Sequence, residues 1–278
     1  MALSAIQTGE RFTDEETEHI RRCFHRDGYY AFGRLMEDEE VEALRADMQR
    51  KWDDPRMHEP ARDQIRGNSL MRMFEYSYAF RDLIVREPFA SLAEAILGDD
   101  CHCMSQNALY TPPNPKAAPD GPGGWHLDDL VHFPLPDGVP RHDPSVPPPC
   151  FILQIFTPLT DVEAVRYGPT QVVPGSHFAG RQPHLPHEQD RPEFDGRGPH
   201  SFLVRKGDAY MFNNQVWHRG APNASDRTRL MAGVTYSKRF IAQKFHPFID
   251  YRMPGHVWAE ASPRLQRMLG RHSKGAYG

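Results

Sequence analysis

The stretch 124–133 reads Gly124-Trp125-His126-Leu127-Asp128-Asp129-Leu130-Val131-His132-Phe133 and places a His-x-Asp pair inside a β-prone run. Side chains two residues apart point to the same face of an extended strand. We therefore predict a strand over 124–133 in which His126 and Asp128 share one face. The fold around this strand follows from the pattern of its neighbours.

Short β-prone runs separated by turn residues lie on both sides of this stretch. We predict strands over 101–110, 150–159, 170–173, 201–204, 208–212 and 230–240. The first hundred residues instead indicate helices over 13–26, 36–52 and 81–97, a strand over 28–33 and an irregular charged segment over 54–80. Short strands in series after a helical start favour a mainly β fold, a sandwich or jelly roll with flanking helices.

The composition bounds the class of protein. The 278 residues are 39% hydrophobic and 25% charged, which is typical of a globular chain. We expect one domain over 1–278, with a helical part at about 1–100, a β core at about 101–245 and a C-terminal helix at about 262–272. Four cysteines are too few for a disulfide framework, so we interpret Cys101-His102-Cys103 as free thiols rather than a metal fragment.

Charge and hydropathy exclude two kinds of partner. The net charge of −4 and the lack of a basic stripe argue against nucleic acid. We find no apolar run of membrane-spanning length and no signal peptide, so we expect a cytoplasmic protein without a membrane partner. The sequence leaves the oligomeric state open.

Two long connections interrupt the β-prone part. Residues 134–149 hold seven prolines, and residues 178–200 are rich in His, Pro, Arg and Asp. Connections of this length inside a compact domain are often functional lids. We expect both connections to border the opening of one active-site pocket. The alternative is that they are solvated insertions without a role.

A metal site is the chemistry that these residues indicate. His126 and Asp128, completed by the distant His218, form a set of two imidazoles and one carboxylate. Non-haem Fe(II) oxygenases bind their metal with this set and keep the other positions open. Turn residues over 220–226 then lead to a strand that we expect to return beside His218. This return would bring Arg229 next to the metal, where its planar guanidinium could bind a carboxylate through two hydrogen bonds. Arg227 is the alternative residue for this role.

Together these motifs resemble the phytanoyl-CoA dioxygenase-like family of Fe(II)/2-oxoglutarate-dependent oxygenases. The matching segments are Trp125-His126-Leu127-Asp128, the run 168–177 that ends in Pro174-Gly175-Ser176-His177, and His218 followed by Asn223 and Arg229. The resemblance implies a double-stranded β-helix, which is a cupin-like jelly roll. It also implies Fe(II) on His126, Asp128 and His218, with O2 and 2-oxoglutarate as co-substrates and the far carboxylate of 2-oxoglutarate on Arg229.

One position departs from the family pattern, and two others narrow what the resemblance implies. Several relatives have a hydroxyl residue two positions after the distal histidine, where this chain has Gly220. A second anchor for 2-oxoglutarate is therefore expected from Asn107, Gln154 or Thr170. The presence of Asp128 argues against a halogenase, because the related halogenases lack that carboxylate. We interpret His177 as part of a turn that fixes strand register.

The expected activity is oxidation, by default hydroxylation, of a C–H bond in a small-molecule metabolite, with release of succinate and CO2. Biosynthesis of a secondary metabolite is one setting for it. The alternative is a cupin-like hydrolase or isomerase with Zn²⁺ or Mn²⁺ on the same three side chains. A third interpretation is a binding protein of the same fold that has no catalytic activity. Arg229 favours the oxygenase, because a hydrolytic site has no need of a buried dicarboxylate clamp.

Overall fold

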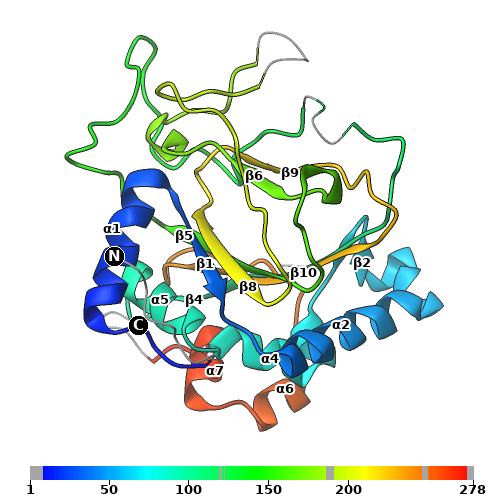
Figure 1. Cartoon of the computed structure of the whole chain (residues 1–278). Coiled ribbons are helices and arrows are strands. Elements are labelled where there is room, and N and C mark those ends of the chain that lie inside the picture. Colours follow the sequence, from blue (N-terminus) through cyan, green and yellow to red (C-terminus); the bar gives the residue numbers. More distant parts are fainter. Residues whose placement is uncertain (1–8, 119–120, 122, 186–190, 246–249, 274–278) are drawn as a thin grey trace.

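The computed structural model describes residues 9–118, 121, 123–185, 191–245 and 250–273, and its frame is a pair of antiparallel sheets (Figure 1). The strands are β1 (Tyr29–Arg34), β2 (Ile65–Arg66), β3 (Ser69–Leu70), β4 (His102–Thr111), β5 (Ile152–Pro158), β6 (Thr170–Val172), β7 (His200–Ser201), β8 (Asp208–Asn213), β9 (His218–Gly220) and β10 (Arg229–Ser237). The large sheet has the order β1-β8-β5-β10-β4-β3-β2 and the small sheet the order β7-β6-β9. The expected mainly β jelly roll is confirmed.

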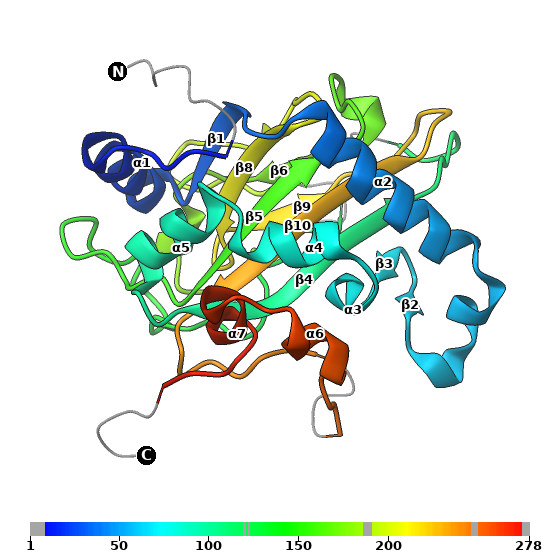
Figure 2. The same cartoon turned by 90° about the horizontal axis from the view of Figure 1, so that it is seen from below.

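Helices cover one face of the large sheet, as Figure 2 shows from below. They are α1 (Asp14–Asp27), α2 (Asp38–Asp53), α3 (Met73–Tyr76), α4 (Tyr78–Val85), α5 (Phe89–Leu97), α6 (Gly255–Ala259) and α7 (Pro263–Met268). Short 3-10 turns lie at Pro55–His58, Pro60–Arg62, Val165–Tyr167 and Ser176–Phe178. Within the described ranges no helix is both long and apolar enough to cross a membrane.

Strand β10 explains how the two faces of the large sheet differ. All nine of its residues are buried. Leu230, Val234 and Tyr236 belong to the main core under the helices, whereas Met231 belongs to a second core between the sheets. Because side chains alternate along a strand, Arg229 and Thr235 share the face of Met231. The side chains of Arg229 and Thr235 therefore point into the space between the two sheets.

The helix predicted over 81–97 is wrong as one element, because it is two helices. Helix α4 begins earlier, after Ser77, whose hydroxyl accepts a hydrogen bond from the Phe80 amide at 3.1 Å. It ends before Arg86, which is extended, and α5 follows Pro88. Proline lacks an amide proton and disfavours helical backbone in the residue before it, so the apolar periodicity could not continue through it.

The predicted strand over 124–133 is also wrong. Only His126 pairs with another strand, as an isolated bridge to His218. Asp129 then takes a left-handed conformation with φ 59°, which turns the chain away. The strand predicted over 201–204 is also shorter than expected, because β7 ends at Ser201 and Val204 forms only an isolated bridge to Val162.

The remaining elements agree with the sequence patterns within a few residues. Thr13 and Glu16 form the expected capping box at the start of α1. The segment over 54–80 is less irregular than expected, because it holds β2, β3 and α3. The C-terminal helix is shorter than 262–272, since α7 spans Pro263–Met268 after a Ser262 cap.

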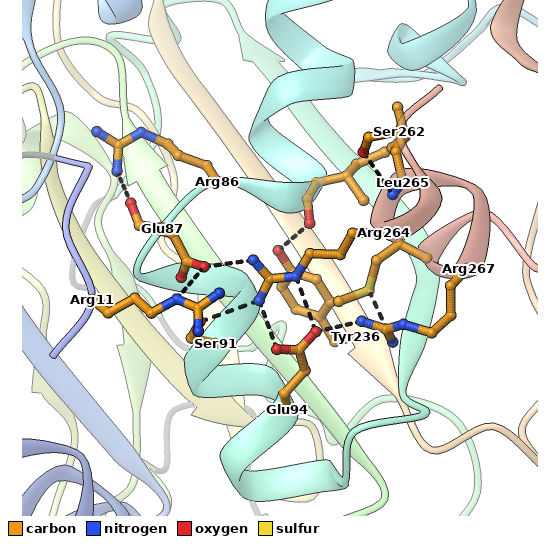
Figure 3. A network of polar contacts seen from close by, with 12 residues as sticks. Arg11, Arg86, Glu87, Ser91, Glu94, Tyr236, Ser262, Arg264, Leu265 and Arg267 are labelled. Carbon is orange, nitrogen blue, oxygen red and sulfur yellow. Dashed lines mark hydrogen bonds and ion pairs between the residues drawn. The ribbon is translucent and has the colours of Figure 1, made fainter. Parts of the chain in front are cut away.

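A polar network attaches the C-terminal helix to the helical layer (Figure 3). The Arg264 guanidinium contacts Glu94 at 2.6 Å and Glu87 at 2.5 Å. Arg11 reaches the same Glu87 oxygen at 2.9 Å, and Arg267 pairs with Glu94. Chain segments from both ends of the described protein are thereby fixed to α5 and to Glu87 just before it.

Candidate metal centre

Three side chains from two distant segments meet at one end of the space between the sheets. One ligand atom from each of His126, Asp128 and His218 lies within 4.8 Å of the other two. The Nε2 atom of His126 is 3.6 Å from Asp128 Oδ1, and the Nε2 atom of His218 is 3.5 Å from Asp128 Oδ2. Two imidazoles and one carboxylate therefore point toward a common centre.

Backbone contacts orient both imidazoles. The Nδ1 atom of His126 lies 2.7 Å from the Gly124 carbonyl, and that of His218 lies 2.8 Å from the Val216 carbonyl. A carbonyl accepts, so each Nδ1 carries the proton and each Nε2 presents its lone pair to the centre. The amide and carbonyl of His126 also pair with those of His218 at 3.0 and 2.8 Å, which fixes the two residues side by side.

Asp128 is held from its backbone and from its side chain. Its amide donates to the Asn214 carbonyl at 3.1 Å, and the Gln154 amide group donates to its Oδ2. Burial alone would raise the pKa of the Asp128 carboxyl, but in the metal-free site His126 and His218, when protonated, lower it well below its ordinary value. The carboxylate therefore stays ionised, as a metal ligand must be.

Arg219 fixes the segment that precedes His126. It is buried, and its Nη1 donates to the carbonyls of Gly121 and Gly123 at 2.5 and 2.9 Å. Its Nε donates to Gln171 at 2.7 Å, and its guanidinium lies 4.9 Å from the centre of the Trp125 ring. No sequence pattern predicts a role for this residue, and its position next to His218 is the only signal of one.

Arg229 is a buried cation whose positive charge meets no carboxylate. Its side chain donates to the Gly168 carbonyl and, at 3.2 Å, to the Thr111 hydroxyl, while its Nε has no partner. Among the described residues no carboxylate lies within ion-pair distance of it. Burial lowers the pKa of Arg229 from its ordinary value. A buried cation without a carboxylate partner suits an anionic ligand.

The predicted hairpin return to Arg229 is wrong in its geometry, although the Arg229 guanidinium does lie beside position 220, two residues after His218. Strand β9 lies in the small sheet and β10 in the large one, so residues 221–228 cross between the sheets. A Cβ placed on Gly220 would lie 3.7 Å from Arg229 Nη2. The guanidinium therefore faces the small sheet two residues beyond His218.

The three expected co-substrate anchors lie in two different places. Thr170 pairs with Gly220 across the small sheet, and its hydroxyl accepts a hydrogen bond from Tyr210 at 2.8 Å. Asn107 instead donates to Thr235 at 2.8 Å, and Gln154 donates to Asp128. Thr170 is thus the candidate nearest the buried guanidinium. Tyr210, which is fully buried and was not predicted, supports it.

Arg227 and His177 lie outside this arrangement. Arg227 is exposed, lies 4.0 Å over the Tyr167 ring and donates to the Asp161 carbonyl at 2.8 Å. His177 is buried with its Nε2 3.0 Å from the His25 carbonyl. The turn before it therefore contacts the end of α1 rather than the metal centre.

The two long connections contact each other and the segment that carries His126 and Asp128. The amide of His142 donates to Phe178 at 2.8 Å, that of Leu135 donates to Gly180 at 3.1 Å, and Arg141 pairs with Asp195. Gln182 accepts a hydrogen bond at 3.2 Å from the amide of Leu127, between the two proposed ligands. Residues 186–190 of the second connection lie outside the described part of the chain.

Comparison with known proteins supports the family resemblance and the fold. The family model described as phytanoyl-CoA dioxygenase (PhyH) matches residues 24–231, about three-quarters of the chain. Three solved structures share the fold at low identity. The epimerase SnoN, in complex with Fe³⁺, α-ketoglutarate and nogalamycin RO, is 21% identical with a TM-score of 0.63, over 87% of this chain and 92% of that chain.

The other two structures are similar in extent. The α-ketoglutarate-dependent carbocyclase SnoK from nogalamycin biosynthesis is 21% identical with a TM-score of 0.60, over 85% of this chain and 88% of that chain. HygX from Streptomyces hygroscopicus, with nickel and 2-oxoglutarate bound, is 18% identical with a TM-score of 0.58, over 83% and 89%. At these identities the likeness concerns the fold, and the family is given by the match over 24–231.

Proposed function

The chain belongs to the phytanoyl-CoA dioxygenase (PhyH) family, and from this premise we propose that it is an Fe(II)- and 2-oxoglutarate-dependent oxygenase of a small molecule. The family match confirms the resemblance drawn from the sequence. The similar structures include an epimerase and a carbocyclase, so several outcomes of C–H oxidation are compatible with this fold. Hydroxylation is the default among them.

The observation that carries the proposal is the placement of Arg229 relative to the triad. Its guanidinium faces position 220, and two residues of strand separate that position from His218, a spacing of roughly 7 Å. A five-carbon dicarboxylate suits this span, with one end at the triad and the other on Arg229. The buried guanidinium would gain the anion that the protein itself does not provide.

The donor set fits the metal. Two neutral imidazole nitrogens and one carboxylate suit Fe(II), and three protein donors leave positions for a bidentate co-substrate and O2. When bound, iron would activate O2, which is the oxidant of both the substrate and 2-oxoglutarate, the latter being converted to succinate and CO2. The Nδ1 contacts of His126 and His218 prevent ring rotation, and Gln154 holds the carboxylate of Asp128. These residues orient the centre before substrate arrives.

The co-substrate end of the site excludes water. Arg229, Thr170 and Tyr210 are all buried there. Thr170, with its hydroxyl oriented by Tyr210, is the second anchor that we propose for the far carboxylate. Arg229 also argues against the rival cupin-like hydrolase or isomerase, for which a dicarboxylate clamp has no use.

Anaerobic addition of Fe(II) and 2-oxoglutarate tests the proposal. We expect the weak visible charge-transfer band of an iron–2-oxoglutarate chelate. Asp128→Ala should weaken Fe(II) binding by more than about 100-fold, because loss of a residue that merely supports a ligand already costs 10–100-fold. Asp53→Ala, at the exposed end of α2, is the control and should bind iron normally. Absence of the band, with tight Zn²⁺ binding instead, would favour the rival metalloenzyme.

A further inference from the structure

A small cavity borders the metal centre at the opposite end of β10 from Arg229. It has a volume of about 180 Å³, and Asp128 and Thr235 both line it. Six residues of β10 separate Thr235 from Arg229, which is roughly 20 Å of strand. The cavity is therefore distinct from the co-substrate clamp, yet it adjoins the carboxylate proposed to bind iron.

Neutral hydrogen-bonding groups dominate the lining. Asn107, Gln154, Asn214 and Thr235 all reach the cavity. The side-chain amide of Asn107 donates one hydrogen bond to the Thr235 hydroxyl at 2.8 Å, and that of Gln154 donates one to Asp128. The side-chain carbonyl oxygen of Asn214 is buried without a partner. Each amide offers four hydrogen-bonding positions, so these side chains retain capacity for a ligand.

Lys244 and Asp129, two of the three charged residues that line the cavity, cancel one another's charge, and the third, Asp128, faces the proposed metal. Lys244 and Asp129 form a direct ion pair, and the Asn214 amide donates to the second oxygen of Asp129 at 3.4 Å. The backbone amide of Lys244 donates to the Met104 carbonyl at 2.7 Å, which fixes this pair at the cavity wall. A zwitterionic or anionic ligand would have to break the pair, whereas hydroxyl groups can bond to its outer edges without breaking it.

We propose that this cavity is the substrate subsite and that it binds a neutral, multiply hydroxylated ring, such as a sugar or a cyclitol. This inference rests on the proposed function, because it assigns the cavity to the substrate of the same metal centre. The volume lies below the 300–1,000 Å³ of pockets that enclose a whole drug-sized ligand, so it accommodates one ring. An acyl chain would leave the amide and hydroxyl groups unpaired, at a cost in binding free energy.

The test uses the anaerobic protein loaded with Fe(II) and 2-oxoglutarate. The probes are methyl β-glucoside and myo-inositol as neutral polyols, L-alanine as a zwitterion and hexanoate as an acyl chain. We expect only the polyols to bind at millimolar concentration and to shift the charge-transfer band. Thr235→Val and Asn107→Leu should each weaken polyol binding about tenfold, as for loss of a desolvated hydrogen bond. Thr17→Val, on α1, should leave it unchanged.

The band recorded without a probe separates the possible failures. If a variant keeps that band, its fold and its co-substrate site are intact, so a loss of polyol binding belongs to the cavity. If the wild type shows the band but binds neither polyol, or binds alanine or hexanoate instead, the inference is overturned and the proposed function stands. If no band forms, the proposed function fails, and this inference fails with it.

Discussion

Arg227 and Arg229 are two residues apart and the fold gives them different environments. Arg229 is 7% exposed and lies between the sheets, whereas Arg227 is exposed and stacks on Tyr167. Strand β10 begins at Arg229, so the alternation that relates residues two apart in a strand does not extend to Arg227. The sequence alone could rank these two arginines only weakly.

Replacement of Arg229 tests the clamp. Arg229→Met should raise the KM for 2-oxoglutarate by about 30-fold or more, because loss of one partner from a buried charge pair costs about 2–5 kcal/mol. The kcat should change much less, since the triad is untouched. Succinate formation at varied 2-oxoglutarate measures both constants. Arg227→Met is the matched control, and an equal effect of the two substitutions would contradict the assignment.

At the scale of elements, the turn between α1 and β1 packs against the support of the metal centre. Gly28 has φ 80°, a left-handed conformation that favours glycine. A Cβ at this position would lie 2.3 Å from Val216 Cγ2 and 2.5 Å from His177 Nδ1. The carbonyl of Val216 orients His218, so this close approach links the helical layer to the site.

Gly28→Ala should therefore destabilise the protein by about 2–4 kcal/mol, from backbone strain together with overpacking. Urea unfolding followed by circular dichroism measures the change. Gly33→Ala is the control in β1, because no heavy atom lies within 4 Å of its added Cβ and its φ is not in the left-handed region. We expect a change within about 0.5 kcal/mol there. Similar losses in both variants would show that the close approach at Gly28 has no special role.

The network around Arg264 should contribute to stability in a pH-dependent way. Arg264→Met should lower the free energy of unfolding by about 1–3 kcal/mol at neutral pH, because Glu87 and Glu94 lose a partly buried partner. Arg45→Met, which removes an exposed pair with Glu42, should cost at most about 0.5 kcal/mol.

The sign of the pH dependence follows from Glu87. Burial alone would raise its pKa, but hydrogen bonds from Ser91 and Arg264 lower it below the ordinary 4.5. A group with a lowered pKa in the folded state stabilises the protein above its unfolded pKa, and this contribution is lost as the pH falls. The difference between wild type and Arg264→Met should thus shrink below about pH 4.5 in unfolding titrations. A difference that stays constant down to pH 3 would rule out this role for Glu87.

At the scale of the whole molecule, the proposed site joins the two sheets. His218 lies on β9 of the small sheet and Arg229 on β10 of the large sheet, as the layers in Figure 1 show. His126 and Asp128 come from the connection between β4 and β5. A metal and a co-substrate that contact all four residues would cross-link the layers.

Ligand binding should accordingly raise the melting temperature. At 100 times the Kd a ligand stabilises the native state by about 2.7 kcal/mol, which corresponds to roughly 5–10 °C for a chain of this size. Anaerobic scanning calorimetry with Fe(II), alone and with 2-oxoglutarate, measures the two increments. Asp128→Ala should lose both, and Arg229→Met only the second. An equal second increment in wild type and Arg229→Met would place 2-oxoglutarate elsewhere.

The sequence by itself determined the features that depend on neighbours along the chain. The capping box of Thr13 and Glu16, the alternation in β10 and the His-x-Asp motif could all be read locally, because backbone geometry and short-range hydrogen bonds set them. Local patterns mislead at Pro88, a helix breaker inside an apolar pattern, and at Asp129, where a left-handed turn ends the expected strand.

Only the tertiary structure decided which polar residues lie around the proposed site. Gln154 bonds to Asp128 rather than lying beside Arg229, Arg219 fixes the segment before His126, and Tyr210 orients Thr170. The burial of Arg229 without a carboxylate partner likewise depends on how two sheets face each other. Contacts of this kind join residues tens of positions apart, and their free energies come from desolvation and packing, which no short window of sequence contains.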